Sequence, residues 1–375
     1  MLASISEELT GLEQRSLRRQ MHTFTQAGKA RLFLEGKSLL NFSSNDYLGL
    51  ARHPQVIEAV RQVLEHGGAG ATSSRLISGT SIIHRDLECA LAAFLHREAA
   101  LLFSSGYMTN LGVIQALVGS GDAVVLDRLC HASLVDAVRL SGARLMVYKH
   151  LDLEEAERAL KRSTSFRRRL LVTESLFSMD GDFAPLEDLQ SLAKRYGAIS
   201  IVDDAHALGV WDTKTAGWDV SVGTLSKAFG SQGGFAAGSR EVVELLINTS
   251  RSFIFTTGLS PLCVAAAQAA LNVIQQDPRR RDHVKNLSAQ LRDGLSILGF
   301  DILGSQSQIV PIRLGEAGRA LACADYLRQS EIFAPAIRPP TVHAGQCRIR
   351  FSVTADHQPA DIDQVLNALK GWKHE

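Results

Sequence analysis

The sequence has no long hydrophobic run, no cysteines at metal-binding spacing and no excess of charge of either sign. No apolar run reaches the roughly 18 residues of a membrane-spanning helix, and the N-terminal stretch is charged and amphipathic rather than a signal peptide. The five cysteines are scattered without a C-x-x-C pair, which argues against a zinc site and a disulfide framework. With 40 basic and 39 acidic residues, the chain has no global attraction to nucleic acid or to an anionic membrane. These absences predict a reduced, cytoplasmic protein without a metal.

The motifs of several large enzyme classes are also absent. There is no G-x-S-x-G nucleophile elbow, no P-loop, no G-x-G-x-x-G and no H-E-x-x-H. Two basic clusters, at residues 161–169 and 279–281, are local. They fit either solvated loop and helix ends or the docking of an anionic carrier or nucleotide tail.

What is present is a regular alternation of helix-like and strand-like segments. At 375 residues and 45% hydrophobic composition, the chain can bury a large core. From His53 to about residue 260, short apolar strands without internal alternation are separated by helices, which predicts a mostly parallel sheet covered on both faces. From Leu262 onward, two long helices (262–276 and 281–298) precede short strands near QIVPIRL and CRIRFSV. This change predicts a separate, smaller α+β domain.

The same pattern divides the chain into three expected parts. Residues 1–45 carry an amphipathic helix over 5–22 and a short strand pair around RLFLEGKSLLNF. A large α/β domain is expected over 46–261, and the α+β domain over 262–375. In a doubly wound sheet, ligands bind at the carboxyl ends of the strands. Polar loops that this topology would bring to one rim are residues 104–110, 129–134, 177–182, 203–206 and 226–230.

Lys227 is the candidate for a covalent bond to a cofactor. It follows the apolar run SVGTL, where a buried strand opens into a Ser/Gly-rich loop, and this position suits a Schiff-base nucleophile. Asp203 follows the run AISIV and suits the partner of a pyridinium nitrogen, while His206 could hold the phenolic oxygen or orient Asp203. The ordinary alternatives are a surface lysine, a loop-capping aspartate and a structural histidine. Together the three residues predict pyridoxal 5'-phosphate (PLP).

Further residues fit the same cofactor. His131 in CHASL could stack on a cofactor ring, although histidines at helix starts are common. Ser105, Gly106 and Tyr107 open a helix whose backbone N–H groups form a phosphate seat, with simple helix capping as the alternative. The hydroxyl of Thr224 could hold the phosphate as well.

Two arginines offer a second binding element. Arg348 and Arg350 alternate in CRIRF, so both side chains leave the same face of a strand. Paired guanidinium groups suit the clamping of a carboxylate. The alternative is a solvated edge strand.

At these residues the sequence closely resembles the α-oxoamine synthase family of fold-type I PLP enzymes, from about Asn41 to His357. The matching segments are NFSSNDYLGL, SGTSIIH, CHASL, ESLFSMDGD, VDDAHALGV, GTLSKAFG and RIRFS, in order and at approximate spacing. The resemblance implies a large domain with a mostly parallel seven-stranded sheet, a smaller α+β C-terminal domain, and a homodimer with the active site at its interface.

The resemblance also implies an activity. Segment 336–342, AIRPPTV, favours condensation of L-alanine with a pimeloyl thioester of CoA or acyl carrier protein, a step of biotin biosynthesis. By this likeness Lys227 holds PLP and moves protons, Asp203 pairs with the pyridine nitrogen, and His131 stacks on the ring. The remaining implied contacts are Ser178 and His206 to the phenolic oxygen, Thr224, Ser105 and the Gly106–Tyr107 backbone to the phosphate, Arg350 and less directly Arg348 to the amino-acid carboxylate, and Asn45 near the substrate.

Three features depart from the family pattern. The connection from Gly209 to Lys227 is shorter than usual, Ala207 stands where glycine or serine is more common, and His343 stands where proline is usual. They leave the acyl-chain specificity open. The alternatives are a sister enzyme that uses glycine or serine, and a non-catalytic PLP-fold protein. A regulator is expected to carry an added DNA-binding domain, for which the residues before NFSSNDYLGL are too few, and a non-catalytic subunit is expected to lack Lys227.

Overall fold

The computed structural model describes residues 2–372, and these fall into two compact units. Unit 1 comprises residues 1–49, 178–182 and 279–375, and unit 2 comprises residues 50–177 and 183–278. Within the described part of the chain, no helix combines the length and hydropathy that crossing a membrane requires.

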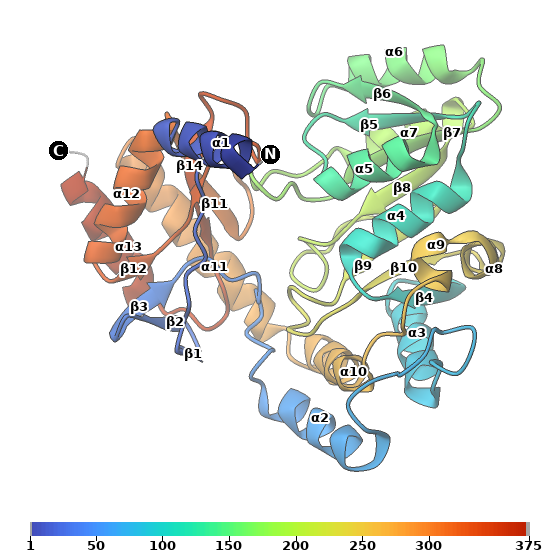
Figure 1. The fold of residues 1–375 in the computed structure, drawn as a ribbon, viewed down its shortest axis with the longest axis horizontal. Helices are drawn as coiled ribbons and strands as arrows, with labels where there is room; N and C mark the ends of the chain where they lie inside the picture. The colour runs from blue at the N-terminus through green and yellow to red at the C-terminus, as the bar shows by residue number, and fades with distance from the viewer. Residues whose placement is uncertain (1, 373–375) are drawn as a thin grey trace. The chain divides into compact units, whose positions relative to one another are not determined.

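Unit 2 is built on the mostly parallel seven-stranded sheet that the sequence predicts (Figure 1). Its strands, in spatial order, are β4 (Ala99–Phe103), β10 (Gly234–Gly238), β9 (Val220–Thr224), β8 (Ile199–Asp203), β7 (Arg169–Glu174), β5 (Ala123–Asp127) and β6 (Arg144–Tyr148). Strand β10 runs antiparallel to both of its neighbours, and the other pairs are parallel. Every residue of β5, β9 and β10 is buried, as expected for strands covered on both faces.

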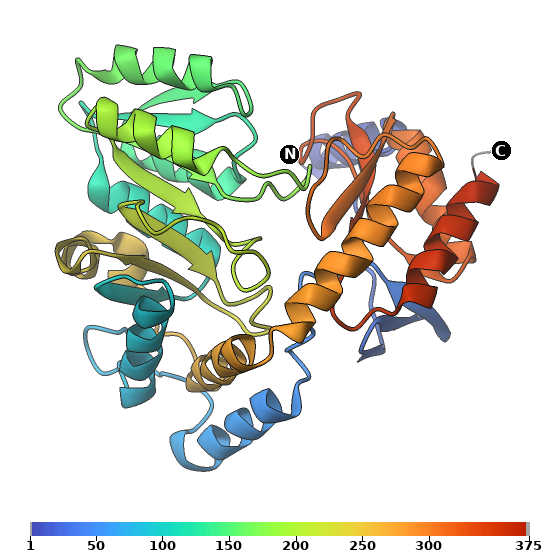
Figure 2. The same cartoon turned by 180° about the vertical axis from the view of Figure 1, so that it is seen from behind.

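Helices cover both faces of this sheet. One layer contains α4 (Gly106–Leu117), α5 (Ala132–Ser141), α8 (Arg240–Thr249) and α9 (Arg251–Ile254), and the other contains α6 (Leu153–Ser163) and α7 (Leu186–Arg195) (Figures 1 and 2). The remaining helices of the unit are α2 (Pro54–Gly67), α3 (Ile82–Phe94) and α10 (Pro261–Gln276), which pack together. The aliphatic side chains between the layers form one continuous buried core.

Local sequence signals place the helix starts that matter for the site. The Ser105 side chain accepts a hydrogen bond from Met108 N at 3.2 Å and so caps α4. His131 occupies the same position before α5, where its ring accepts from Ser133 N at 3.3 Å. Gly142 ends α5 in the left-handed conformation that favours glycine. Both helices therefore begin directly after the carboxyl side of the sheet.

Unit 1 contains two smaller sheets and the helices that cover them. One sheet is β1 (Gln26–Gly28), β2 (Arg31–Leu34), β3 (Lys37–Asn41) and β12 (Ile332–Phe333), and the other is β11 (Ile309–Gly315), β14 (Cys347–Ser352) and β13 (Ala336–Ile337). The helices are α1 (Leu2–Gln14), α11 (Arg279–Ile297), α12 (Ala317–Gln329) and α13 (Pro359–Trp372). The strand pair β2–β3 and the α+β character of the C-terminal part match the prediction.

The units divide the chain differently from the three expected parts. Residues 1–49 belong with the C-terminal region, because β12 pairs in parallel with β3 and Ser352 N donates to Phe42 O. Helix α10 belongs to unit 2. Helix α1 ends at Gln14 rather than at residue 22, since Ser16 takes a left-handed conformation with φ of 57°.

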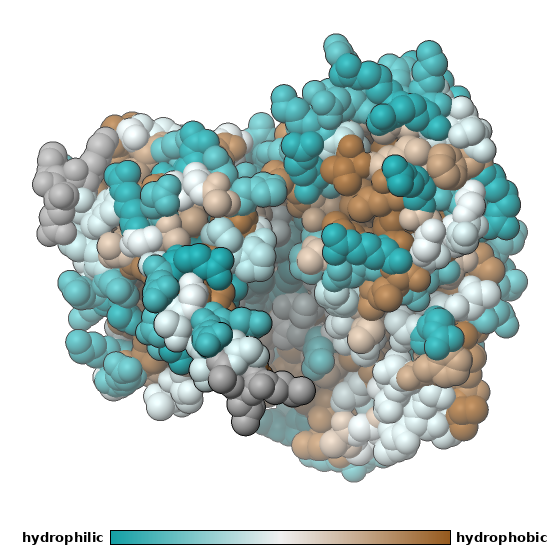
Figure 3. Space-filling model, turned by 45° about the horizontal axis from the view of Figure 1, so that its top comes forward, coloured by the Kyte–Doolittle hydropathy of each residue, from teal (hydrophilic) through white to brown (hydrophobic). Residues whose placement is uncertain are grey.

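Apolar side chains also reach the surface. Figure 3 shows brown, apolar groups among the teal, polar ones on the face it presents. In unit 2, Ile77 is 81% exposed and Ile82 is 72% exposed, with Leu76 beside them in the sequence. An isolated bridge between Ser74 and Thr257 joins this loop to the segment that carries exposed Phe255. Large apolar side chains that are exposed together on neighbouring segments are typical of an interaction surface.

Candidate active site

The polar residues predicted in unit 2 gather at the carboxyl edge of the sheet. Asp203 ends β8 and Thr224 ends β9. Strand β4 points the same way as these strands because β10 is antiparallel to both β4 and β9, so Ser105 follows its carboxyl end. Asp203 lies directly beside Glu174, the last residue of β7, in the parallel register. Residues 104–110, 129–134 and 203–206 therefore meet as the topology predicts, whereas residues 178–182 of the predicted rim belong to unit 1.

Asp203 is buried and held by two donors. Its Oδ2 accepts from Asn110 Nδ2 at 2.8 Å, and its Oδ1 accepts from Ala205 N at 3.0 Å. Asp203 is 6% exposed, and His206, three residues later, is buried too. The carboxylate is thus fixed in place with lone pairs left for a further donor, such as the N–H of a pyridinium ring.

His131 is held by its backbone and by its ring. Its N–H donates to Glu174 Oε1 at 2.5 Å, and its ring Nδ1 lies 2.7 Å from Ser133 Oγ. The residue is exposed, yet desolvation of the ring lowers its pKa, with Asp203 raising it and Lys227 lowering it further. A neutral ring, open on one side and fixed on the other, is suited to stacking on a flat cofactor.

Glu174 joins the candidate residues. Burial and, after it, the negative charge of Asp203 raise the pKa of Glu174 to about 8, although the positive charge of Lys227 opposes the rise. Lys227 therefore acts electrostatically on both Glu174 and His131. The structure brings together Lys227, Asp203 and His131, which lie far apart in the sequence, and adds Glu174 to them.

A small, polar cradle lies at the start of α4. Thr224 Oγ1 donates to Gly233 O at 3.0 Å and lies 2.8 Å from Ser226 Oγ. A Cβ built on Gly106 would meet Thr224 Cβ at 3.3 Å, and one on Gly234 would meet the Gly106 backbone nitrogen at 2.6 Å. Glycine at both positions thus lets β9 and β10 pack closely on the start of α4, where hydroxyl groups and the first N–H groups of the helix are the donors that a phosphate requires.

Tyr107 has its own partner. Its hydroxyl donates to Asp136 Oδ2 at 2.5 Å, and this hydrogen bond raises the pKa of Tyr107. Its ring meets that of His131 edge to face, with 6.3 Å between the centroids. The Tyr107 backbone therefore remains the part that fits a phosphate.

In unit 1, the guanidinium of Arg350 is buried at the centre of a network. Its Nε donates to Ser178 O at 2.6 Å, and its Nη2 donates to Tyr47 Oη at 3.3 Å. Two longer contacts, of 3.3 and 3.4 Å, reach Asn45 Oδ1. Strand β14 is central in its sheet and fully buried, so the alternative of a solvated edge strand is wrong.

Arg348 has different partners. Its Nη1 donates to Asp180 Oδ1 at 2.9 Å and to Met179 O at 3.0 Å, and its Nε donates to Gln346 O. The side chains of Arg348 and Asp180 are 5% and 16% exposed, so this ion pair is shielded. Arg348 thus fixes the segment 178–182, which leaves Arg350 the stronger candidate for a substrate carboxylate.

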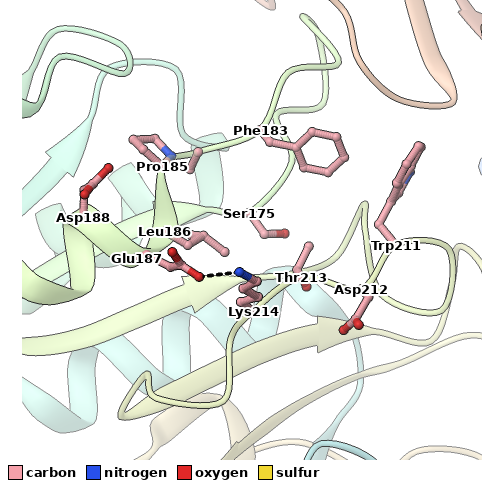
Figure 4. Close-up of a pocket in the computed structure, with 11 residues that line it drawn as sticks. Ser175, Phe183, Pro185, Leu186, Glu187, Asp188, Trp211, Asp212, Thr213 and Lys214 are labelled. Carbon is pink, nitrogen blue, oxygen red and sulfur yellow. Dashed lines mark hydrogen bonds and ion pairs between the residues drawn. The ribbon is translucent and has the colours of Figure 1, made fainter.

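A pocket of about 430 Å³ lies elsewhere in unit 2. Figure 4 shows Phe183 and Trp211 on one side and the ion pair of Lys214 with Glu187 on the other. Its lining hydroxyls, Ser175 and Thr213, bind the buried carboxyl of Asp204 at 2.5 and 2.8 Å. Burial raises the pKa of Asp204 to about 7. The short connection after Gly209 is therefore tied to the residue next to Asp203.

Residue reasoning on the sequence missed Glu174, Asn110, Ser133 and Asp204. Glu174 and Ser133 stand inside the segments ESLFSMDGD and CHASL, Asn110 ends the polar loop of residues 104–110, and Asp204 is the second aspartate of VDDAHALGV. A polar residue beside a predicted strand end was the available signal. Their importance comes from contacts between segments, which the sequence does not display.

Comparison with known proteins places this site in a family. The model of the aminotransferase class I and II family matches residues 37–369. The 8-amino-7-oxononanoate synthase of Geobacter sulfurreducens is 43% identical, covering 98% of this chain and 97% of its own, and that of Anaeromyxobacter dehalogenans is 46% identical, covering 97% and 94%.

Solved structures agree with this result. A serine palmitoyltransferase variant from S. paucimobilis with a bound PLP–myriocin adduct has a TM-score of 0.93 at 30% identity, covering 98% of this chain and 96% of its own. The 8-amino-7-oxononanoate synthase of Francisella tularensis has a TM-score of 0.78 at 25% identity, covering 90% and 98%. The fold-type I architecture expected for unit 2 is thereby confirmed. The chain belongs to the aminotransferase class I and II family, among the α-oxoamine synthases whose motifs it carries.

Proposed function

We propose that this chain is a PLP-dependent acyltransferase that condenses L-alanine with a pimeloyl thioester. The products are 8-amino-7-oxononanoate, carbon dioxide and the free thiol, in a step of biotin biosynthesis. The observation that carries the proposal is the identity of 40–46%, over nearly the whole chain, with relatives named 8-amino-7-oxononanoate synthase. The Lys227, Asp203 and His131 cluster supplies the residue types that this chemistry needs.

The donor set of unit 2 fits PLP. Lys227 offers an amine, Asp203 a buried carboxylate, and His131 a flat ring, while the hydroxyl of Thr224 and the first N–H groups of α4 are donors that suit a phosphate. When bound, PLP draws electrons away from the α-carbon of an attached amino acid, which makes its α-proton acidic.

The residues of the chain then have separate tasks. Asp203 holds the proton on the pyridine nitrogen, since a buried carboxylate fixed by Asn110 is an acceptor that water does not screen. Lys227 Nζ holds the cofactor first and afterwards accepts the α-proton of alanine. His131 covers the ring with its neutral imidazole. His206 would contact the phenolic oxygen.

Arg350 binds the carboxylate of alanine. Its contacts with Asn45 and Tyr47, at 3.3 to 3.4 Å, are longer than those with Ser178 O and Ser352 Oγ, at 2.6 and 2.9 Å, so they are the ones that a carboxylate would replace, leaving Asn45 beside the substrate. A guanidinium held by Ser178 O and Ser352 Oγ is already oriented for this fork. Once the new carbon–carbon bond has formed, loss of this carboxylate as carbon dioxide completes the condensation.

A sister activity is the second candidate. The solved serine palmitoyltransferases share 30% identity with the chain at a TM-score of 0.93, and their fold and machinery suit serine equally well. The two candidates differ in the amino acid and the acyl chain consumed.

We also propose a homodimer. The exposed apolar side chains Ile77, Ile82 and Phe255 in unit 2 are the surface that a second copy would cover. Light scattering on the purified protein checks this: twice the chain mass is expected, and a fully active monomer would contradict it.

The main experiment measures free thiol release with L-alanine, glycine or L-serine, each combined with pimeloyl-CoA, acetyl-CoA or palmitoyl-CoA. Turnover that requires alanine and pimeloyl-CoA, and that is lost in Lys227→Ala, is expected. A preference for serine and palmitoyl-CoA would move the chain to the sister activity. Undiminished turnover in Lys227→Ala would contradict the site assignment itself.

A further inference from the structure

Asn110 joins two residues to which the cofactor site assigns separate tasks. It lies in the first turns of α4, is 2% exposed, and its Nδ2 donates to Asp203 Oδ2 at 2.8 Å and to Ser133 Oγ at 2.9 Å. Both amide protons are used, so the side chain has one orientation. Its Oδ1 is buried and has no hydrogen-bond partner among the described residues. The hydrogen bonds that orient the Asn110 amide are thus the two that it donates, so its task is to position their acceptors, Asp203 and Ser133.

Ser133 continues the connection to the ring of His131. It is fully buried, in the first turn of α5, and its Oγ lies 2.7 Å from His131 Nδ1. Because Oγ accepts from Asn110, its own proton is free to point at Nδ1. Nδ1 also accepts from Ser133 N at 3.3 Å. Nδ1 is therefore the acceptor nitrogen, and Nε2 carries the proton of the neutral ring.

The fold explains why these residues meet. Helices α4 and α5 pack against each other on one face of the sheet, and each begins just after a strand ends. The first turn of each helix therefore faces the same rim that carries Asp203. Asp203, Asn110 and Ser133 are buried, so the hydrogen bonds among them are electrostatically strong, because water neither competes for them nor screens them.

We propose that Asn110 and Ser133 are positioning residues that couple the carboxylate under the pyridine nitrogen to the imidazole over the ring. The relay runs from Asp203 through Asn110 and Ser133 to His131, and it sets the carboxylate position and the imidazole tautomer together. This inference rests on the proposed function, since it takes the tasks of Asp203 and His131 from it. It assigns the relay residues no contact with PLP or substrate.

The test measures the dissociation constant of PLP and the pH midpoint of the visible cofactor band in four proteins: wild type, Asn110→Ala, Ser133→Ala and the double variant. Asn110→Ala removes the hydrogen bonds to Asp203 and Ser133, and we expect PLP binding about tenfold weaker, equivalent to about 1.4 kcal/mol. Ser133→Ala removes the hydrogen bonds to Asn110 and His131, for which about threefold is expected. The double variant should lose less than the product of the two single losses, because both substitutions remove the Asn110–Ser133 bond, and the band midpoint should move in each variant.

Two further proteins separate positioning from packing. Ser163→Ala removes an equally buried serine hydroxyl, one that bonds only its own helix at Leu160 O, and should bind PLP as the wild type does. Ser133→Thr keeps a hydroxyl and should recover most of the loss. Nitrogen-15 spectra of labelled histidine should show the Nε2–H tautomer of His131 in the wild type and its loss in Ser133→Ala.

The outcomes distinguish the inference from the function beneath it. If the wild type fails to bind PLP, the proposed function fails. If the wild type binds PLP but Asn110→Ala and Ser133→Ala match it in affinity and band midpoint, the relay alone is refuted. The relay is also refuted if the fold-losses in PLP affinity of the two single variants multiply in the double variant. Their free energies would then add, as they do for two independent packing defects.

Discussion

His357 should make the stability of unit 1 depend on pH. Its ring is fully buried and stacks on Phe42, with 4.1 Å between the centroids and 11° between the planes. Nδ1 accepts from Thr354 N at 3.0 Å, and Nε2 donates to Asn41 O at 3.1 Å. Both hydrogen bonds thus require the neutral ring. If Nδ1 were protonated, its N–H would point at the N–H of Thr354, and two donors would face each other.

The magnitude follows from the pKa of this ring. Burial lowers the pKa of His357 from 6.5 to about 4. The folded pKa lies below the unfolded one, so the unfolded chain binds the proton first and stability is lost as pH falls from 6.5 toward 4. At about 1.4 kcal/mol for each pH unit, the full loss is about 3 kcal/mol, of which about 2 kcal/mol falls between pH 7 and pH 5.

Urea denaturation at several pH values tests this reasoning. The free energy of unfolding of the wild type should exceed that of His357→Gln by a margin that narrows by about 2 kcal/mol between pH 7 and pH 5. A constant margin for His357→Gln would refute the assignment of a neutral buried ring.

Three further substitutions test other features. Glu331→Gly should raise stability by about 1 kcal/mol in thermal denaturation, because exposed Glu331 holds φ at 61°, and no gain would mean that the conformation costs nothing. Gly234→Ala should weaken PLP binding by at least about tenfold, because the added Cβ would lie 2.6 Å from Gly106 N and would displace the start of α4. Wild-type affinity in an absorbance titration would show that the backbone shifts without harm to the phosphate site. Glu88→Ala should cost about 3 kcal/mol of unfolding free energy by leaving the guanidinium of Arg75 buried and unpaired, and a loss below about 1 kcal/mol would contradict this.

The sheet and its catalytic edge could be read from the sequence because both depend on local patterns. The unalternating apolar runs predict buried parallel strands, and the polar residues after them, Asp203 and Thr224, fall at one edge by topology alone. Lys227 stands out because a charged residue follows a buried strand.

The rest depends on contacts that no local pattern contains. Asn110 and Ser133 are ordinary helix residues until the packing of α4 on α5 brings them between Asp203 and His131. The amphipathic helix expected over residues 5–22 ends at Gln14, just before the backbone turns and Arg338 donates to Ser16 O. That arginine lies at the other end of the chain, so the sequence near the helix could not indicate the stop.

The interleaving of the two units bears on how the chain is made. Strand β3 is complete early in synthesis, but its parallel partner β12 emerges only near the end, when Ile332 can reach Leu40. Unit 2 lies almost entirely between these two segments, so a ribosome releases its whole sheet before unit 1 can close. We expect unit 2 to fold first during translation, and fragments that stop before β12 to expose the unpaired edge of β3.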